Sequence, residues 1–146
     1  MKLCMIGTGY VGLVSGVCFA DIGNQVICVD KDKNKIDKLN SGISPIYEPG
    51  LDELIKKNFV AKRLSFTTDI KKAISTSDII FICVGTPTKK GSIKVDLSFI
   101  YKCAKEILKY SKRKKIIITK STVPVGTGDE IEKILKKKEK TFNSNL

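Results

Sequence analysis

The chain has 146 residues, of which 42% are hydrophobic and 29% charged, a composition typical of one soluble domain with enough apolar material for a core. This excludes disordered and collagen-like proteins. No apolar run approaches the roughly 20 residues that span a bilayer, and the apolar start runs into glycines instead of a signal peptide. The net charge of +12 comes from 25 Lys and only 2 Arg, without interleaved aromatic residues, which favours solvated helix faces over a nucleic-acid-binding surface. We therefore expect a single cytoplasmic domain over residues 1–146 that binds neither membrane nor nucleic acid.

Short apolar runs along the chain predict the strands of a parallel sheet. Their apolar character is continuous instead of alternating, as is required of parallel strands that helices cover on both faces. The predicted strands, in chain order, are Lys2–Ile6, Gln25–Asp30, the weaker Leu64–Thr67, Asp78–Val84 and Lys115–Lys120.

Helical spacing fills the segments between these strands. A first helix opens at the glycine-rich turn after Ile6, and an apolar stripe from Leu97 to Leu108 follows a candidate N-cap at Asp96. The other predicted helices are Leu51–Asn58, Asp69–Ile74 and Gly128–Lys140. This alternation predicts an α/β fold, a Rossmann-type doubly wound parallel sheet of about five to six strands in a single domain. The ending, residues 141–146, resembles the approach to a sixth strand.

The glycine motif Gly7-Thr8-Gly9-Tyr10-Val11-Gly12 directly follows the first strand. In this setting Gly7 permits the tight turn, Gly9 lets the backbone approach a pyrophosphate, and Gly12 allows close packing of helix and strand. Asp30 ends the second strand, 18 residues after Gly12, where its carboxylate can bind an adenosine ribose 2′-OH and repel a 2′-phosphate. These residues predict a dinucleotide site that prefers NAD, although Lys31, Lys33 and Lys35 would tolerate an extra phosphate. The alternative is a turn that needs small residues for packing alone.

Two further loops follow strands at the sheet edge where open α/β sheets bind ligands. They are Gly85-Thr86-Pro87-Thr88 and Ser121-Thr122-Val123-Pro124-Val125-Gly126. Each offers hydroxyls and free backbone groups beside a proline-fixed turn, suited to the ribose or nicotinamide side of the cofactor. A third turn, Pro45–Gly50, carries Glu48, which could act as an acid or base but is better explained as an exposed loop carboxylate.

The five cysteines are interpreted as structural. They form no C-x-x-C pair, and Cys4, Cys28 and Cys83 sit in apolar runs where a free thiol behaves as a small hydrophobe. Since the chain has no histidine, it has few ligands for zinc, and we expect no metal site.

Taken in order, several segments resemble the N-terminal domain of the UDP-glucose 6-dehydrogenases, within the wider UDP-glucose/GDP-mannose dehydrogenase family. The resemblance spans nearly the whole chain and is more specific than any single motif. The matching segments are Ile6–Val14, Val29–Asp32 with Lys35-Ile36, Pro45–Leu51, Leu64–Asp69, Val84–Pro87 and Lys120–Thr127.

The resemblance implies an enzyme that oxidises UDP-glucose to UDP-glucuronate with two NAD, in a family that tends to form homo-oligomers. Matched residue by residue, it implies cofactor contacts at Val11, Asp30, Lys35, Thr86 and Thr122. It also implies a supporting catalytic role for Thr122. With the motif residues, the expected cofactor site comprises Gly7, Gly9, Tyr10, Val11, Gly12, Asp30, Lys35, Gly85, Thr86, Pro87, Ser121 and Thr122.

The chain also departs from the family pattern. The family's nucleophilic Cys, its catalytic Lys and Asn, its central helix and its UDP-binding domain have no counterpart in residues 1–146, and no cysteine here matches the nucleophile. We therefore expect a shortened copy that is inactive alone. Oxidation of GDP-mannose or a UDP-N-acetylhexosamine stays open as an alternative, as does a non-catalytic NAD-sensing module.

Overall fold

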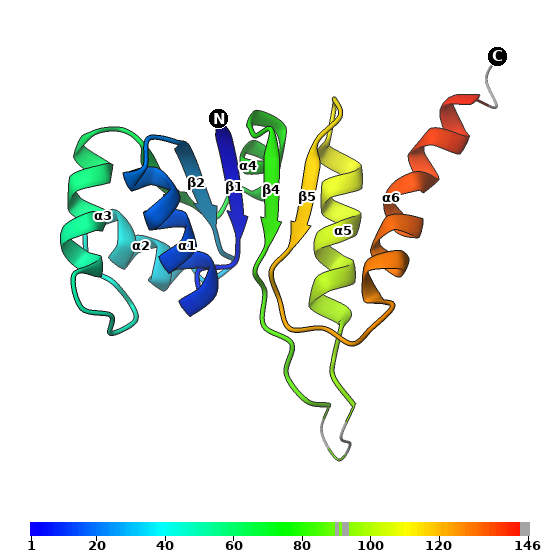
Figure 1. The fold of residues 1–146 in the computed structure, drawn as a ribbon, viewed down its shortest axis with the longest axis horizontal. Helices are drawn as coiled ribbons and strands as arrows, with labels where there is room; N and C mark the ends of the chain where they lie inside the picture. The colour runs from blue at the N-terminus through cyan, green and yellow to red at the C-terminus, as the bar shows by residue number, and fades with distance from the viewer. Residues whose placement is uncertain (90, 92–93, 144–146) are drawn as a thin grey trace.

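The fold is a five-stranded parallel sheet between two layers of helices (Figure 1). The computed structural model describes residues 1–89, 91 and 94–143. The strand order is β3-β2-β1-β4-β5, so the chain builds outward from β1 in one direction and then returns to build outward in the other. This confirms the predicted doubly wound sheet of Rossmann type. The strands are β1 (Lys2–Ile6), β2 (Gln25–Val29), β3 (Leu64–Thr67), β4 (Ile79–Ile82) and β5 (Ile116–Thr119).

Three helices cover each face of the sheet. The helices α1 (Tyr10–Asp21), α2 (Lys33–Asn40) and α3 (Leu51–Val60) pack on one face. The helices α4 (Ile70–Thr76), α5 (Ser98–Tyr110) and α6 (Thr127–Asn143) pack on the other. Among the residues described, no helix is both long enough and apolar enough to cross a membrane.

The two apolar cores meet at the central strands. In β1, Met5 points into the core beneath α1–α3, whereas its neighbour Cys4 points into the core beneath α4–α6, and both are fully buried. Because successive side chains of a strand point to opposite faces, only a continuous apolar run can supply both cores. Full burial of a side chain the size of Met5 contributes about 1.5–3 kcal/mol.

The edge strand β5 differs from this pattern. Ile117 packs into the core beneath α4–α6, but Ile116 is 60% exposed and Ile118 is also exposed. The prediction of cover on both faces is therefore wrong for β5. The physical reason is topological, because α1–α3 belong to the half of the sheet that holds β1–β3 and do not extend over β5.

The observed helices also correct the predicted ones. The helix α2 was not predicted, although Asp32 caps it by accepting a hydrogen bond from the Lys35 backbone N–H. Residues 141–143, predicted as the approach to a sixth strand, continue α6, and residues 144–146 lie outside the described part of the chain. In α5 the N-cap is Leu97, one residue after the predicted Asp96, whose carboxylate still accepts from the Ser98 N–H at 2.9 Å.

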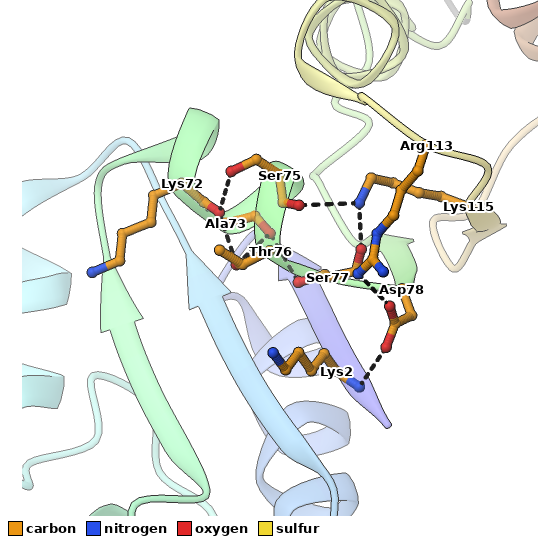
Figure 2. A network of polar contacts seen from close by, with 9 residues as sticks. All are labelled: Lys2, Lys72, Ala73, Ser75, Thr76, Ser77, Asp78, Arg113 and Lys115. Atoms are coloured by element: carbon orange, nitrogen blue, oxygen red, sulfur yellow. Dashed lines mark hydrogen bonds and ion pairs between the residues drawn. The ribbon is translucent and has the colours of Figure 1, made fainter.

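A polar network ties the amino ends of three strands together (Figure 2). The Asp78 carboxylate accepts from the Lys2 backbone N–H at 3.2 Å and pairs with Arg113 at 2.5 Å. The Lys115 ammonium donates to the backbone carbonyl of Ser77, at the C-terminal end of α4. This network lies at the sheet edge opposite the carboxyl ends of the strands. Substitutions in it therefore affect the fold without touching the site described below.

Candidate functional site

A cavity of about 590 Å³ lies at the carboxyl ends of the central strands, where β1, β2 and β4 meet the helices α4 and α5. Its volume falls in the range of small-molecule and cofactor sites. It also lies at the point where the strand order reverses, the position at which open α/β sheets bind ligands. The lining residues are Ile6, Gly7, Gly9, Val29, Asp30, Lys31, Lys35, Thr68, Ile70, Cys83, Val84, Gly85, Pro87, Phe99, Lys102, Cys103 and Glu106.

The three motif glycines have different surroundings. Gly7 has a φ of +105°, and a Cβ there would lie 2.6 Å from the Cys83 carbonyl oxygen. A Cβ on Gly12 would lie 2.0 Å from the Gly7 carbonyl oxygen, so both positions exclude any side chain for reasons internal to the fold. Gly9 has ordinary extended geometry, and a Cβ there would meet no atom within 4 Å. The open space at Gly9 lies directly before the N-terminus of α1, whose free N–H groups and dipole favour an anion.

Both oxygens of the Asp30 carboxylate accept hydrogen bonds that hold it in place. One oxygen, Oδ2, accepts from the Thr8 N–H at 2.9 Å and from the Thr8 hydroxyl at 2.8 Å, while Oδ1 accepts from the Asp32 N–H at 3.1 Å. Burial alone would raise the pKa of Asp30, but these three hydrogen bonds and the Lys35 charge outweigh it and hold the pKa below its usual range. Asp30 is therefore a fixed carboxylate at the end of β2.

The lysines that follow Asp30 are placed differently from one another. Lys35 lines the cavity, where its charge favours a bound phosphate or ribose. The Lys31 ammonium lies 4.7 Å from the centre of the Phe99 ring, a cation–π contact across the cavity wall. Lys33 pairs with Asp37 at 2.6 Å on the outer face of α2. Three lysines after Asp30 could offset its repulsion of the NADP phosphate. Of these, Lys33 pairs with a carboxylate of its own helix and does not line the cavity.

The two predicted loops lie beside each other at the strand ends. The Thr86 hydroxyl donates to the Thr122 carbonyl oxygen at 2.9 Å, and the Ser121 hydroxyl donates to the Val84 carbonyl oxygen at 2.7 Å. Gly85 and Pro87 line the cavity. The structure therefore brings both loops to one place. Thr86, Ser121 and Thr122 do not line the cavity, and the hydroxyls of Thr86 and Ser121 join the two loops.

The remaining predicted positions do not line the cavity. Tyr10 and Val11 are exposed on the first turn of α1, and Gly12, in the same turn, is buried. Glu48 lines a separate cavity of about 250 Å³ formed by residues 46–50, 52 and 53. That cavity shares no lining residue with the first, so the structure places Glu48 in a different site.

Two buried thiols, Cys83 and Cys103, line the cavity, and two others, Cys4 and Cys28, lie in the apolar cores. Burial raises the pKa of Cys83 and of Cys103 to about 11. Burial likewise raises the pKa of Cys4 to about 12 and that of Cys28 further. A thiol is nucleophilic as its thiolate, so these four side chains are protonated and poorly reactive at neutral pH. The predicted burial of Cys4, Cys28 and Cys83 is confirmed.

Several residues of the site were not predicted from the sequence. Thr8 does not line the cavity but holds Asp30, and its hydroxyl between two motif glycines was the only sequence signal for this role. Phe99, Lys102 and Glu106 share one side of α5, off its apolar stripe, and nothing in the sequence connects them to the glycine motif. No group of three His, Cys, Asp or Glu side chains suited to a metal ion occurs within the described ranges.

These features define a class of protein: a Rossmann-type domain with a dinucleotide-sized site at its topological switch point. Residues 1–146 match the model of the UDP-glucose/GDP-mannose dehydrogenase family, NAD binding domain. The chain belongs to this family, and the part that it represents is the NAD-binding domain.

Curated relatives and solved structures agree with this assignment. The chain is 55% identical to UDP-glucose 6-dehydrogenase of Rhizobium meliloti, over 93% of its own length and 31% of that protein. It is 52% identical to UDP-glucose 6-dehydrogenase TuaD of Bacillus subtilis, over 95% of its own length and 30% of that protein. A ternary complex of GDP-mannose dehydrogenase from Pseudomonas aeruginosa superposes with a TM-score of 0.89 at 40% identity, covering 94% of this chain and 32% of that one. UDP-D-ManNAc dehydrogenase from Pyrococcus horikoshii superposes with a TM-score of 0.87 at 30% identity, covering 94% and 32%. The chain thus spans about a third of the length of these proteins.

Proposed function

We propose that this chain binds NAD in the cavity at the carboxyl ends of β1, β2 and β4, as the cofactor-binding part of a UDP-glucose 6-dehydrogenase. One observation carries the proposal: the open space at Gly9, before the N-terminus of α1, lies in the same cavity as the fixed carboxylate of Asp30. These are the two features that recognise a pyrophosphate and an adenosine ribose.

The geometry supports one orientation of the cofactor. The α1 N-terminus at Gly9 would hold the pyrophosphate, and Asp30 with Lys35 would hold the adenosine ribose. The joined loops at Thr86 and Thr122 would then lie toward the nicotinamide, the part of NAD that accepts the hydride when the cofactor is bound. In this arrangement Thr122 supports the reacting end by position, and the chain's own task is to bind and orient.

The relatives support UDP-glucose as the substrate of the whole protein. Two UDP-glucose 6-dehydrogenases are 55% and 52% identical to this chain, while the UDP-glucose 6-dehydrogenase of Pseudomonas aeruginosa, at 41%, is as distant as a GDP-mannose dehydrogenase at 40%. Oxidation of GDP-mannose or of a UDP-N-acetylhexosamine is the alternative, supported by the close superposition of dehydrogenases for GDP-mannose and UDP-D-ManNAc. The five free cysteines fit a reducing compartment such as the cytoplasm.

Calorimetric titration of the 146-residue chain with NAD and with NADP tests the cofactor site. We expect NAD to bind more tightly than NADP, because the Asp30 carboxylate accepts from a 2′-OH and repels a 2′-phosphate. Asp30→Ala should weaken NAD binding and relax the preference. Glu53→Ala removes the same charge from an exposed position on α3 that does not line the cavity, and should change neither value. Equal affinity of the unaltered chain for both dinucleotides would contradict the proposed site.

A chimera tests the role in a whole enzyme. Residues 1–143 would replace the matching segment of the Rhizobium meliloti UDP-glucose 6-dehydrogenase, to which the chain is 55% identical. We expect the chimera to reduce NAD with UDP-glucose and to lose this activity with Asp30→Ala. A folded chimera that binds UDP-glucose but reduces no NAD would contradict the proposal.

A further inference from the structure

The residue between the first two motif glycines, Thr8, holds the Asp30 carboxylate through two separate groups. Its backbone N–H and its hydroxyl both reach Oδ2, at 2.9 and 2.8 Å. Thr8 is fully buried, so water does not compete for either contact. Because the Asp30 pKa is held below its usual range, the carboxylate is ionised and can only accept, which makes the hydroxyl the donor.

Counting acceptor positions shows which oxygen of Asp30 is left for a ligand. An ionised carboxylate has about four lone-pair sites, two on each oxygen. The two donors of Thr8 occupy both sites on Oδ2, and the Asp32 N–H occupies one site on Oδ1. One site therefore stays open, on Oδ1.

We infer that Thr8 is a positioning residue for cofactor selection: its hydroxyl fixes the Asp30 carboxylate so that Oδ1 presents a single acceptor site to a ribose 2′-OH. This inference rests on the proposed NAD site and adds a residue that acts on the cofactor through Asp30. The backbone N–H groups of Thr8 and Asp32 hold one site on each oxygen, and the Thr8 hydroxyl adds a third contact that resists rotation of the carboxylate when a 2′-phosphate approaches. The fixed orientation thus favours the hydroxyl of NAD and strengthens the repulsion of the phosphate of NADP.

The test compares Thr8→Val with Thr8→Ser. Valine keeps the branched shape and the backbone N–H but removes the hydroxyl, whereas serine keeps the hydroxyl and removes only the methyl group. Both variants and the unaltered chain are titrated with NAD and NADP by calorimetry, and thermal unfolding reports whether each is folded. The Asp30 pKa is followed by carboxyl NMR, as a second measurement that needs no ligand.

In Thr8→Val we expect the ratio of NAD to NADP affinity to fall about threefold to tenfold, less than the full effect of one charge-assisted hydrogen bond because Thr8 acts on the ligand through Asp30, and the Asp30 pKa to rise. Thr8→Ser should keep the ratio within about twofold and leave the pKa unchanged. A folded Thr8→Val chain that keeps both the ratio and the pKa would overturn the inference. If valine prevents folding, Thr8→Ala, which removes the same hydroxyl and leaves space, is held to the same criterion.

The two proposals fail in different ways. An unaltered chain that binds neither dinucleotide contradicts the proposed NAD site and this inference with it. If the unaltered chain prefers NAD and the Thr8→Val chain prefers NAD to the same degree, only the role of Thr8 is contradicted.

Discussion

Replacing Gly9 with valine should separate ligand binding from folding. Gly9 is the N-cap of α1, with φ −75° and ψ −174°, an extended conformation that a β-branched residue adopts readily. A Cβ at this position meets no atom within 4 Å. The protein without ligand can therefore accommodate the added side chain. With ligand, this side chain would project into the space that a pyrophosphate would occupy before the helix.

The structure gives different magnitudes for the two effects. Valine is a poorer N-cap than glycine, which costs about 1 kcal/mol of the free energy of unfolding. A bound pyrophosphate that is displaced loses at least one charge-assisted hydrogen bond from the helix N-terminus, worth about 1.5–3 kcal/mol. The expected loss of NADH affinity is therefore about tenfold to a hundredfold, in a chain that stays folded.

NADH fluorescence titration measures the affinity, and thermal unfolding measures the stability. Gly12→Ala is the contrasting variant, because its Cβ would lie 2.0 Å from the Gly7 carbonyl oxygen and should destabilise the fold itself. A folded Gly9→Val chain that binds NADH as tightly as the unaltered chain would contradict a pyrophosphate site at Gly9, since the glycine loop would then serve packing alone.

Three further predictions concern thiols, pH and the opposite edge of the sheet. At pH 7.5 iodoacetamide should modify the exposed Cys18 first and leave Cys83 intact, since a pKa of about 11 leaves about one Cys83 thiolate in a few thousand. Rapid alkylation of Cys83 in the folded chain, read by mass spectrometry, would contradict its burial. For the same reason, with UDP-glucose and NAD the chain should form no NADH above background, and Cys83→Ser should not alter this. NAD affinity measured by calorimetry should be flat from pH 8 to about 5, because the lowered pKa of Asp30 keeps its carboxylate ionised in the folded chain throughout this range. A loss of affinity near pH 6 would contradict this assignment. Arg113→Ala, which removes the half-exposed ion pair to Asp78, should lower the free energy of unfolding by less than about 1 kcal/mol and leave NAD affinity unchanged; a large fall in affinity would show that the two sheet edges are coupled (Figure 2).

The central strands and the glycine motif were predictable because their signals are local. A continuous apolar run such as that of β4 can only be satisfied between two helix layers, and Gly7 and Gly12 stand where the turn and the helix come too close for a side chain. The helix α2 was missed because only Ile36 and Leu39 among its residues are buried, too few for a clear apolar stripe.

The parts of the site that escaped prediction depend on contacts between distant segments. The hydroxyl of Thr8 meets Asp30 only because β1 and β2 pair in register, with Ile6 beside Val29. Phe99 reaches the cavity because α5 packs on the face next to β4, and the chain order alone does not say which of its sides faces the site. Period and composition describe one element at a time, so they do not show these juxtapositions.

Amide chemical shifts during a titration with NAD show where on the chain the dinucleotide binds. In a ¹⁵N-labelled chain we expect the largest changes on the N–H groups of Gly9, Asp32 and Gly85, at the carboxyl ends of the strands. The N–H groups of Lys2 and Arg113, at the opposite edge of the sheet, should not move. Largest changes at that opposite edge, or no change at millimolar NAD, would contradict the claim that this chain binds NAD in the cavity beside Gly9 and Asp30.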